Sequence, residues 1–70
     1  MEYIIRLIWD EESGVWIATN DEIPVALEAD SVDVLIERVR TAIPELIEMN
    51  HLPMPQSLYF LAEKHVEVMA

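Results

Sequence analysis

Acidic side chains dominate the residues of this sequence that could perform chemistry. Fourteen Asp and Glu stand against four Lys and Arg, which gives a formal net charge of -10. Carboxylates of this kind can bind the divalent metal ions that hydrolyse phosphodiesters. The candidates in the first half of the chain are Asp10, Glu11, Glu12, Asp21, Glu22, Glu28 and Asp30.

A two-metal site would need its carboxylates on adjacent central strands, aimed at one point. Here Asp10 to Glu12 occupy a turn and Asp21 and Glu22 precede an edge strand, while the most strand-like segment, Tyr3 to Trp9, holds no carboxylate. We therefore expect no catalytic residue and no metal site, and a protein that is not an enzyme.

His51 and His65 are the remaining candidate metal ligands. Zinc takes three or four nitrogen or sulfur ligands, and the chain has no cysteine or third histidine to complete such a set. Both histidines are expected to be exposed polar residues. A single glycine cannot form a glycine-rich phosphate loop, so no cofactor is expected.

The net negative charge limits the classes of partner that the protein is expected to bind. It disfavours phosphate backbones and anionic lipid, so neither nucleic acid nor membrane is an expected direct ligand. A basic protein is the partner that such a field would attract, although acidic charge also simply keeps a small domain in solution. No apolar run approaches the roughly 20 residues that span a bilayer, and we expect a cytoplasmic protein.

Alternating apolar residues predict two strands joined by a tight turn. Residues 3–9 and 15–19 follow period two, and the first segment is apolar on both faces, as in a central strand. Gly14, in the turn between them, can adopt positive φ. A short third strand is expected at residues 25–28, at an edge, because Pro24 donates no ladder hydrogen bond.

One helix and a last strand complete the pattern. Asp30 or Ser31 can cap a helix whose apolar residues recur at spacings of three and four as far as Met49, and Asn50 is a suitable stop. After a loop with two prolines, alternation from Leu58 to Val68 predicts a long final strand.

The predicted fold is α+β, in the order β-β-β-α-β. One helix packs on one face of a three- to four-stranded, mostly antiparallel sheet. The connection through the helix is long enough for a right-handed crossover, so the last strand can lie parallel to the first, in spatial order 3-2-1-4. Residues 1–70 are expected to form a single domain without a separate DNA-binding domain.

Two features could serve either the fold or an interface. Trp9 and Trp16 can pack across the hairpin as core, which is the favoured prediction, or stand exposed as binding anchors. The last strand either completes the sheet or offers an open edge to another chain. We expect a homodimer through this edge, with contacts from Tyr59, Leu61, Val66 and Val68.

Several segments together resemble the HicB-like antitoxin domain, over roughly residues 1 to 50. They are the hairpin Trp9 to Ala18, the segment Asp21 to Pro24, the helix start Glu28 to Ser31 and the helix end Pro44 to Asn50. The resemblance implies a partial ribonuclease-H-like fold and a protein that binds and neutralises a small basic ribonuclease toxin of the HicA type.

The sequence departs from that family in two respects. It has Pro24-Val25-Ala26 where the family often has Pro-Gly-Leu, and within residues 1–70 we expect no ribbon-helix-helix or helix-turn-helix of the kind that usually binds operator DNA. It thus looks like a short, single-domain subgroup, and repression of its own operator by this chain is in doubt.

The resemblance implies a non-catalytic antitoxin-type protein whose acidic surface covers a basic partner. The expected charged contacts are Asp10, Glu11, Glu12, Asp21 and Glu22. The alternative is a stand-alone homodimeric interaction or structural module with no toxin partner.

Overall fold

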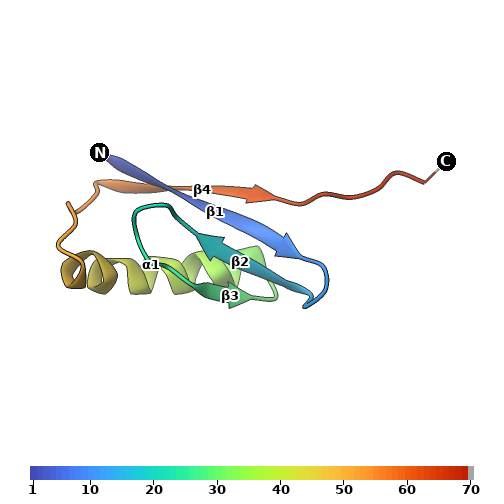
Figure 1. The fold of residues 1–70 in the computed structure, drawn as a ribbon, viewed down its shortest axis with the longest axis horizontal. Coiled ribbons are helices and arrows are strands. Elements are labelled where there is room, and N and C mark those ends of the chain that lie inside the picture. Colours follow the sequence, from blue (N-terminus) through green and yellow to red (C-terminus); the bar gives the residue numbers. More distant parts are fainter. Residues whose placement is uncertain (70) are drawn as a thin grey trace.

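Strand β1 (Glu2–Asp10) is the centre around which the sheet is built (Figure 1). The computed structural model describes residues 1–69. β1 pairs antiparallel with β2 (Val15–Thr19) and parallel with β4 (Ser57–Glu63), while β3 (Leu27–Ala29) pairs antiparallel with β2. Helix α1 (Val32–Met49) packs on one face. The predicted α+β class, the element order and the spatial order 3-2-1-4 are confirmed.

The two faces of the sheet are unlike. Tyr3, Ile5 and Leu7 of β1 are buried beneath α1. The residues between them point to the other side, where Ile4 is 53% exposed. The registers with β2 and β4 extend this division across the sheet. The sheet therefore has one buried face and one open face, so the apolar character that the sequence shows on both sides of β1 is buried on one side alone.

Helix α1 begins and ends where its capping residues predict. The Ser31 hydroxyl accepts a hydrogen bond from the backbone N–H of Val34 at 3.1 Å, and the N–H of Asn50 donates to the carbonyl of Leu46 at 3.1 Å. His51 follows with a φ of 53°, a left-handed residue of the kind that ends helices. Within residues 1–69, no helix is long and apolar enough to cross a membrane.

A single apolar cluster between sheet and helix forms the core. The helix contributes residues spaced by four, and the strands and the loop before β3 contribute the rest. Apart from the phenol of Tyr3, no polar or charged side chain among residues 1–69 is buried. The buried members are Tyr3, Ile5, Leu7, Ala18, Ile23, Val25, Ala29, Leu35, Val39, Ile43 and Ile47.

The third strand is shorter and later than predicted, at Leu27–Ala29 instead of residues 25–28. The N–H of Val25 bonds to the carbonyl of Ile23 at 2.7 Å, a tight local turn around Pro24. Ile23 and Val25 are buried by this turn and not by strand pairing. Its place at the sheet edge is confirmed.

The last strand ends at Glu63 and not near Val68, so this part of the prediction is wrong. β4 pairs with β1 as far as Ile8 opposite Glu63, and β1 itself ends at Asp10, where the chain turns away. In this register Val66 and the described residues after it lie past the end of β1, so β1 offers them no partner. Val66 and Val68 lie outside any strand, 66% and 95% exposed, in the segment that projects past the sheet in Figure 1.

Asn20 ties the end of β2 to β1 through its side chain. Its Nδ2 donates to the carbonyl of Ile4 at 2.7 Å, and its Oδ1 accepts from the N–H groups of Glu22 and Ile23, both at 2.8 Å. These bonds hold the loop that inserts the buried Ile23 into the core.

We predict that Asn20→Ala lowers the free energy of unfolding by about 2 kcal/mol, because three hydrogen bonds are lost at about 0.5–1.5 kcal/mol each and part of the site is open to water. Asn20→Asp keeps the two acceptor bonds and loses the donor, so a smaller loss is expected. Urea denaturation measures both. Asp21→Ala, at an exposed neighbour, is the control, and equal stability of Asn20→Ala and this control would contradict the prediction.

Tyr3 anchors the loop before β4. Its hydroxyl donates to the carbonyl of Pro53 at 2.9 Å. Desolvation by burial raises the pKa of Tyr3 above its ordinary value of 10.0, and the carboxylate of Glu22 raises it further. The folded state therefore keeps the phenol proton at a pH where the unfolded state has begun to release it.

From this linkage, stability should fall as pH rises above about 10, since the unfolded state then binds fewer protons than the folded state. Urea midpoints measured up to and above this pH should decline more steeply for the wild type than for Tyr3→Phe. Tyr59→Phe removes an exposed phenol and serves as the matched control. A decline in Tyr3→Phe as steep as in the wild type would refute the assignment to Tyr3.

Candidate functional site

The turn between β1 and β2 presents the first group of predicted contact residues. Gly14 has a φ of 67° and donates its N–H to the carbonyl of Asp10 at 2.8 Å. The Asp10 carboxylate accepts from the N–H of Glu12 at 3.2 Å, so it shapes the turn. Glu11 and Glu12 are exposed and direct the charge of the turn to solvent.

Asp21 and Glu22, the second group, lie in the loop between β2 and β3 and are exposed. Asp10 pairs with Val15 at one end of β2, whereas Asp21 follows its other end. A strand of this length spans about 17 Å. The structure thus separates the two predicted acidic groups to opposite ends of the sheet (Figure 1).

The carboxylates are spread over the surface and do not gather into one site. No three His, Asp or Glu side chains among residues 1–69 lie where they could hold a metal ion together, and His51 and His65 are both exposed. In this described part of the chain, ion pairs involve Glu63, 2.7 Å from Arg6, and Glu37, 3.5 Å from Arg40. The other acidic residues keep their charge unpaired at the surface.

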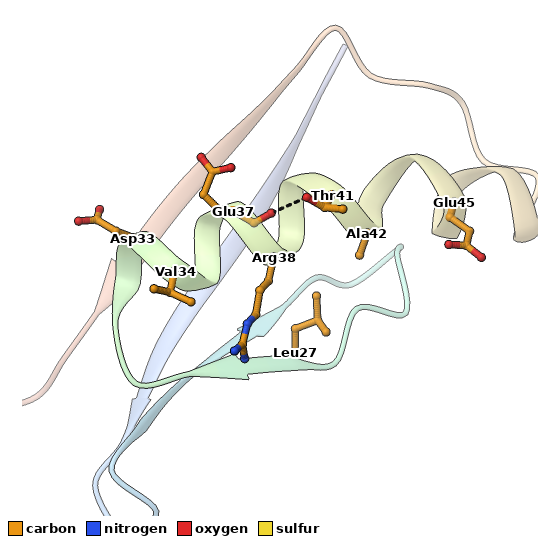
Figure 2. Close-up of a pocket in the computed structure, with 8 residues that line it drawn as sticks. All are labelled: Leu27, Asp33, Val34, Glu37, Arg38, Thr41, Ala42 and Glu45. Carbon is orange, nitrogen blue, oxygen red and sulfur yellow. Dashed lines mark hydrogen bonds between the residues drawn. The ribbon is translucent and has the colours of Figure 1, made fainter.

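A groove of about 800 Å³ follows α1 on the side facing β3 (Figure 2). Its apolar residues are Leu27, Val34 and Ala42. Acidic residues of α1 stand along it, namely Asp33, Glu37 and Glu45. In Figure 2, Leu27 points from β3 toward the helix, beside the Arg38 side chain that reaches down from α1.

The groove continues toward the end of α1. A second hollow of about 370 Å³ shares Leu27, Ala42 and Glu45 with the first. It adds apolar lining from the loop before β3 and from the last helical turn, where the residues are Pro24, Ala26, Leu46 and Met49. We call the two together the α1–β3 groove. Val34 near one end and Met49 at the other are exposed apolar side chains.

Arg38 is the basic residue that lines this groove. Its Nη1 donates to the backbone carbonyl of Glu28 at 2.7 Å, which fixes the guanidinium against β3. The three carboxylates of the rim outnumber it, and the exposed contact of Glu37 with Arg40 is of the kind that contributes little energy. The groove is therefore apolar inside and negative at its rim.

The two acidic groups lie beyond the two ends of the groove. β3 ends opposite Trp16, beside the β1–β2 turn, and α1 starts shortly after it. The other end of the groove is lined by Pro24 and Ala26, which follow Asp21 and Glu22 in the chain. The groove was not predicted from the sequence. Val34 and Met49, apolar at exposed helix positions, were the available signal.

Trp9 and Trp16 pack against each other across the hairpin, as the pairing of β1 with β2 requires. Their ring centroids are 5.4 Å apart in an edge-to-face arrangement. Trp16 also packs against the core, as predicted. Trp9 is half-buried, and the ammonium of Lys64 lies over its ring, 4.4 Å from the centroid.

A solved structure and a family model match this chain. The crystal structure of a hypothetical protein, TTHA1013, from the extremely thermophilic bacterium Thermus thermophilus matches with a TM-score of 0.77 and 27% identity, and 100% of each chain is covered. No curated protein is significantly similar to the sequence. The model of the family described as a domain of unknown function, DUF1902, matches residues 2–69. Since this match takes in nearly the whole sequence, the chain belongs to the DUF1902 family.

Proposed function

We propose that this chain is a HicB-like antitoxin-type protein, a non-catalytic domain of the cytoplasm that binds and neutralises a small basic ribonuclease toxin of the HicA type. The α1–β3 groove is the observation that carries the proposal, because it joins an apolar lining to a rim of three carboxylates. The resemblance of the hairpin from Trp9 to Ala18 and of the segment from Asp21 to Pro24 supports it.

The charge of the partner follows from its own substrate. A ribonuclease must offer a basic surface to the phosphates of RNA. The same surface is attracted by an acidic protein, which steers the encounter and then occupies the place of the nucleic acid. Neutralisation in this proposal is thus competition for one basic face, and it needs no chemistry from the antitoxin.

The arrangement of the acidic residues supports binding and not catalysis. Carboxylates at the β1–β2 turn and at the loop after β2 lie too far apart to act on one bond. They are well placed to contact the ends of a partner that lies along the groove. In the proposed complex, apolar side chains of the partner fill the groove, and Glu37 and Glu45 contact basic residues at the centre of the partner surface. The carboxylates at the two ends contact basic residues toward its two ends; they are Glu11, Glu12, Asp21 and Glu22.

The alternative function is a stand-alone homodimeric module with no toxin partner. It is favoured by the uncovered, apolar edge of β4. Genomic neighbourhood separates the two possibilities, because a toxin partner requires a small basic protein encoded beside this chain.

Four double charge reversals with the same change in net charge test the groove. They are Glu37→Lys with Glu45→Lys in the groove, Glu11→Lys with Glu12→Lys at the turn, Asp21→Lys with Glu22→Lys at the loop, and Glu28→Lys with Glu67→Lys as the control. The Glu28 side chain is on the open sheet face, because Glu28 pairs with Ile17. We expect the double substitution in the groove to weaken binding about 100-fold and each of those at the turn and the loop about tenfold. The control should weaken binding less than any of these three.

The measurement is calorimetric titration of the adjacent small basic protein, after co-purification at low and moderate salt. Affinity should decrease as salt increases. Failure to bind any small basic ribonuclease encoded beside this chain would refute the antitoxin proposal. Equal weakening by all four pairs would show that net charge, and not the groove, determines binding.

A further inference from the structure

The sheet has two edge strands, and the edge at β3 is closed to pairing. β3 is three residues long, follows Pro24 and carries Glu28 at its centre. The guanidinium of Arg38 donates a hydrogen bond from Nη1 to the backbone carbonyl of Glu28 at 2.7 Å, so this carbonyl already has a partner. Shortness, proline, a charge and an occupied backbone group are the devices by which proteins prevent edge-to-edge association.

The edge at β4 has none of these devices along its centre. β4 is seven residues long, and its five central residues, Leu58 to Ala62, are apolar or aromatic without any charge. One side of the strand pairs with β1. Among residues 1–69 no strand pairs with the other side, since β4 ends the order of the sheet. Its backbone groups on that side form a template for another strand.

Both faces of this edge are also incompletely covered. Tyr59 and Leu61, on the open face, are 51% and 42% exposed. Leu58 and Phe60, on the helix face, reach the core but stay half-buried, because α1 packs closest to β2 and β3. A strand added here would cover apolar side chains above and below the sheet.

Charge identifies the occupant as a second copy of this chain. Two molecules with a formal net charge of -10 repel each other over most of their surfaces. The β4 edge is an uncharged strip, and at its end Glu63 is paired with Arg6 at 2.7 Å. A basic partner would be attracted to the carboxylates elsewhere, whereas another β4 edge matches this one in length, polarity and lack of charge.

We propose that two copies associate through antiparallel pairing of β4 with β4, which forms one continuous eight-stranded sheet around a two-fold axis. Pairing centred on Phe60 sets Tyr59 opposite the partner's Leu61, an aromatic and aliphatic cross-strand pair. It also keeps the two Glu63 carboxylates at opposite ends of the seam. Val66 and Val68 then extend past the paired strands toward the loop that precedes the partner's β4. This pairing does not depend on a toxin partner.

Sedimentation equilibrium over a wide range of protein concentration tests the pairing in the full chain. The wild type should form a dimer in a concentration-dependent manner. Leu61→Lys places two like charges near the two-fold axis and should raise the dissociation constant at least about tenfold. Ile4→Lys is the matched control, because Ile4 is exposed on the same face but lies in the central strand β1. It should leave the dissociation constant unchanged.

Amide hydrogen exchange of the wild type provides a second readout that needs no variant. Alternate N–H groups of β4 should exchange more slowly as protein concentration rises, while those of β3 should not change. A monomer at every concentration, or β4 amides whose exchange is independent of concentration, would overturn the proposal. Dissociation of the dimer by Ile4→Lys as strongly as by Leu61→Lys would also overturn it, since stacking of open faces would then hold the dimer.

Discussion

The packing of one helix against one face of a four-stranded sheet is the constraint on which the rest of the structure depends. Buried residues of α1, spaced by four, meet the alternate residues of β1, and together they form most of the core. A helix is about 10 Å wide with its side chains, whereas four strands at about 4.8 Å spacing form a wider surface. The helix is therefore too narrow to cover β4 fully, and because it is the one helix of residues 1–69 the other sheet face stays open.

The same constraint explains where the charges lie. Burying a carboxylate costs free energy unless it is paired and hydrogen-bonded, and none is buried among residues 1–69. Each basic side chain is used locally, by Glu63, the Glu28 carbonyl, Glu37 or the Trp9 ring. Most carboxylates consequently have no basic neighbour, and negative charge predominates at the surface. Arg38 has the further effect of closing the β3 edge while it moderates the charge of the groove.

Much of the fold could be predicted because it depends on local patterns. Alternation in β1, the cap at Ser31 and the stop at Asn50 are properties of short segments, and they gave the correct elements and order. The two errors concern strand limits that depend on neighbours. β3 starts late because Pro24 sits in a turn that buries Ile23, and β4 cannot extend to Val68 because β1 ends at Asp10.

The candidate site was predictable only in part, for the same physical reason. The sequence identified the acidic residues, and the predicted hairpin already placed one group before and the other after the second strand, at the two ends of β2. The groove lies along the flank of α1 that faces β3, and its place follows only from the position of the helix above β2 and β3. Asn20 was missed because one polar residue in a loop gives no sign of three simultaneous hydrogen bonds.

The two proposed surfaces are compatible because they occupy opposite edges of the same sheet. The α1–β3 groove lies at the β3 edge, and the self-pairing strand is β4, at the other end of the order β3-β2-β1-β4. In a β4-paired dimer each groove would face outward at one end of an eight-stranded sheet. A small partner could then contact one groove only, and binding of one partner per chain would leave the dimer seam intact. Antitoxin function and dimerisation are thus independent properties of this fold, and either can hold without the other.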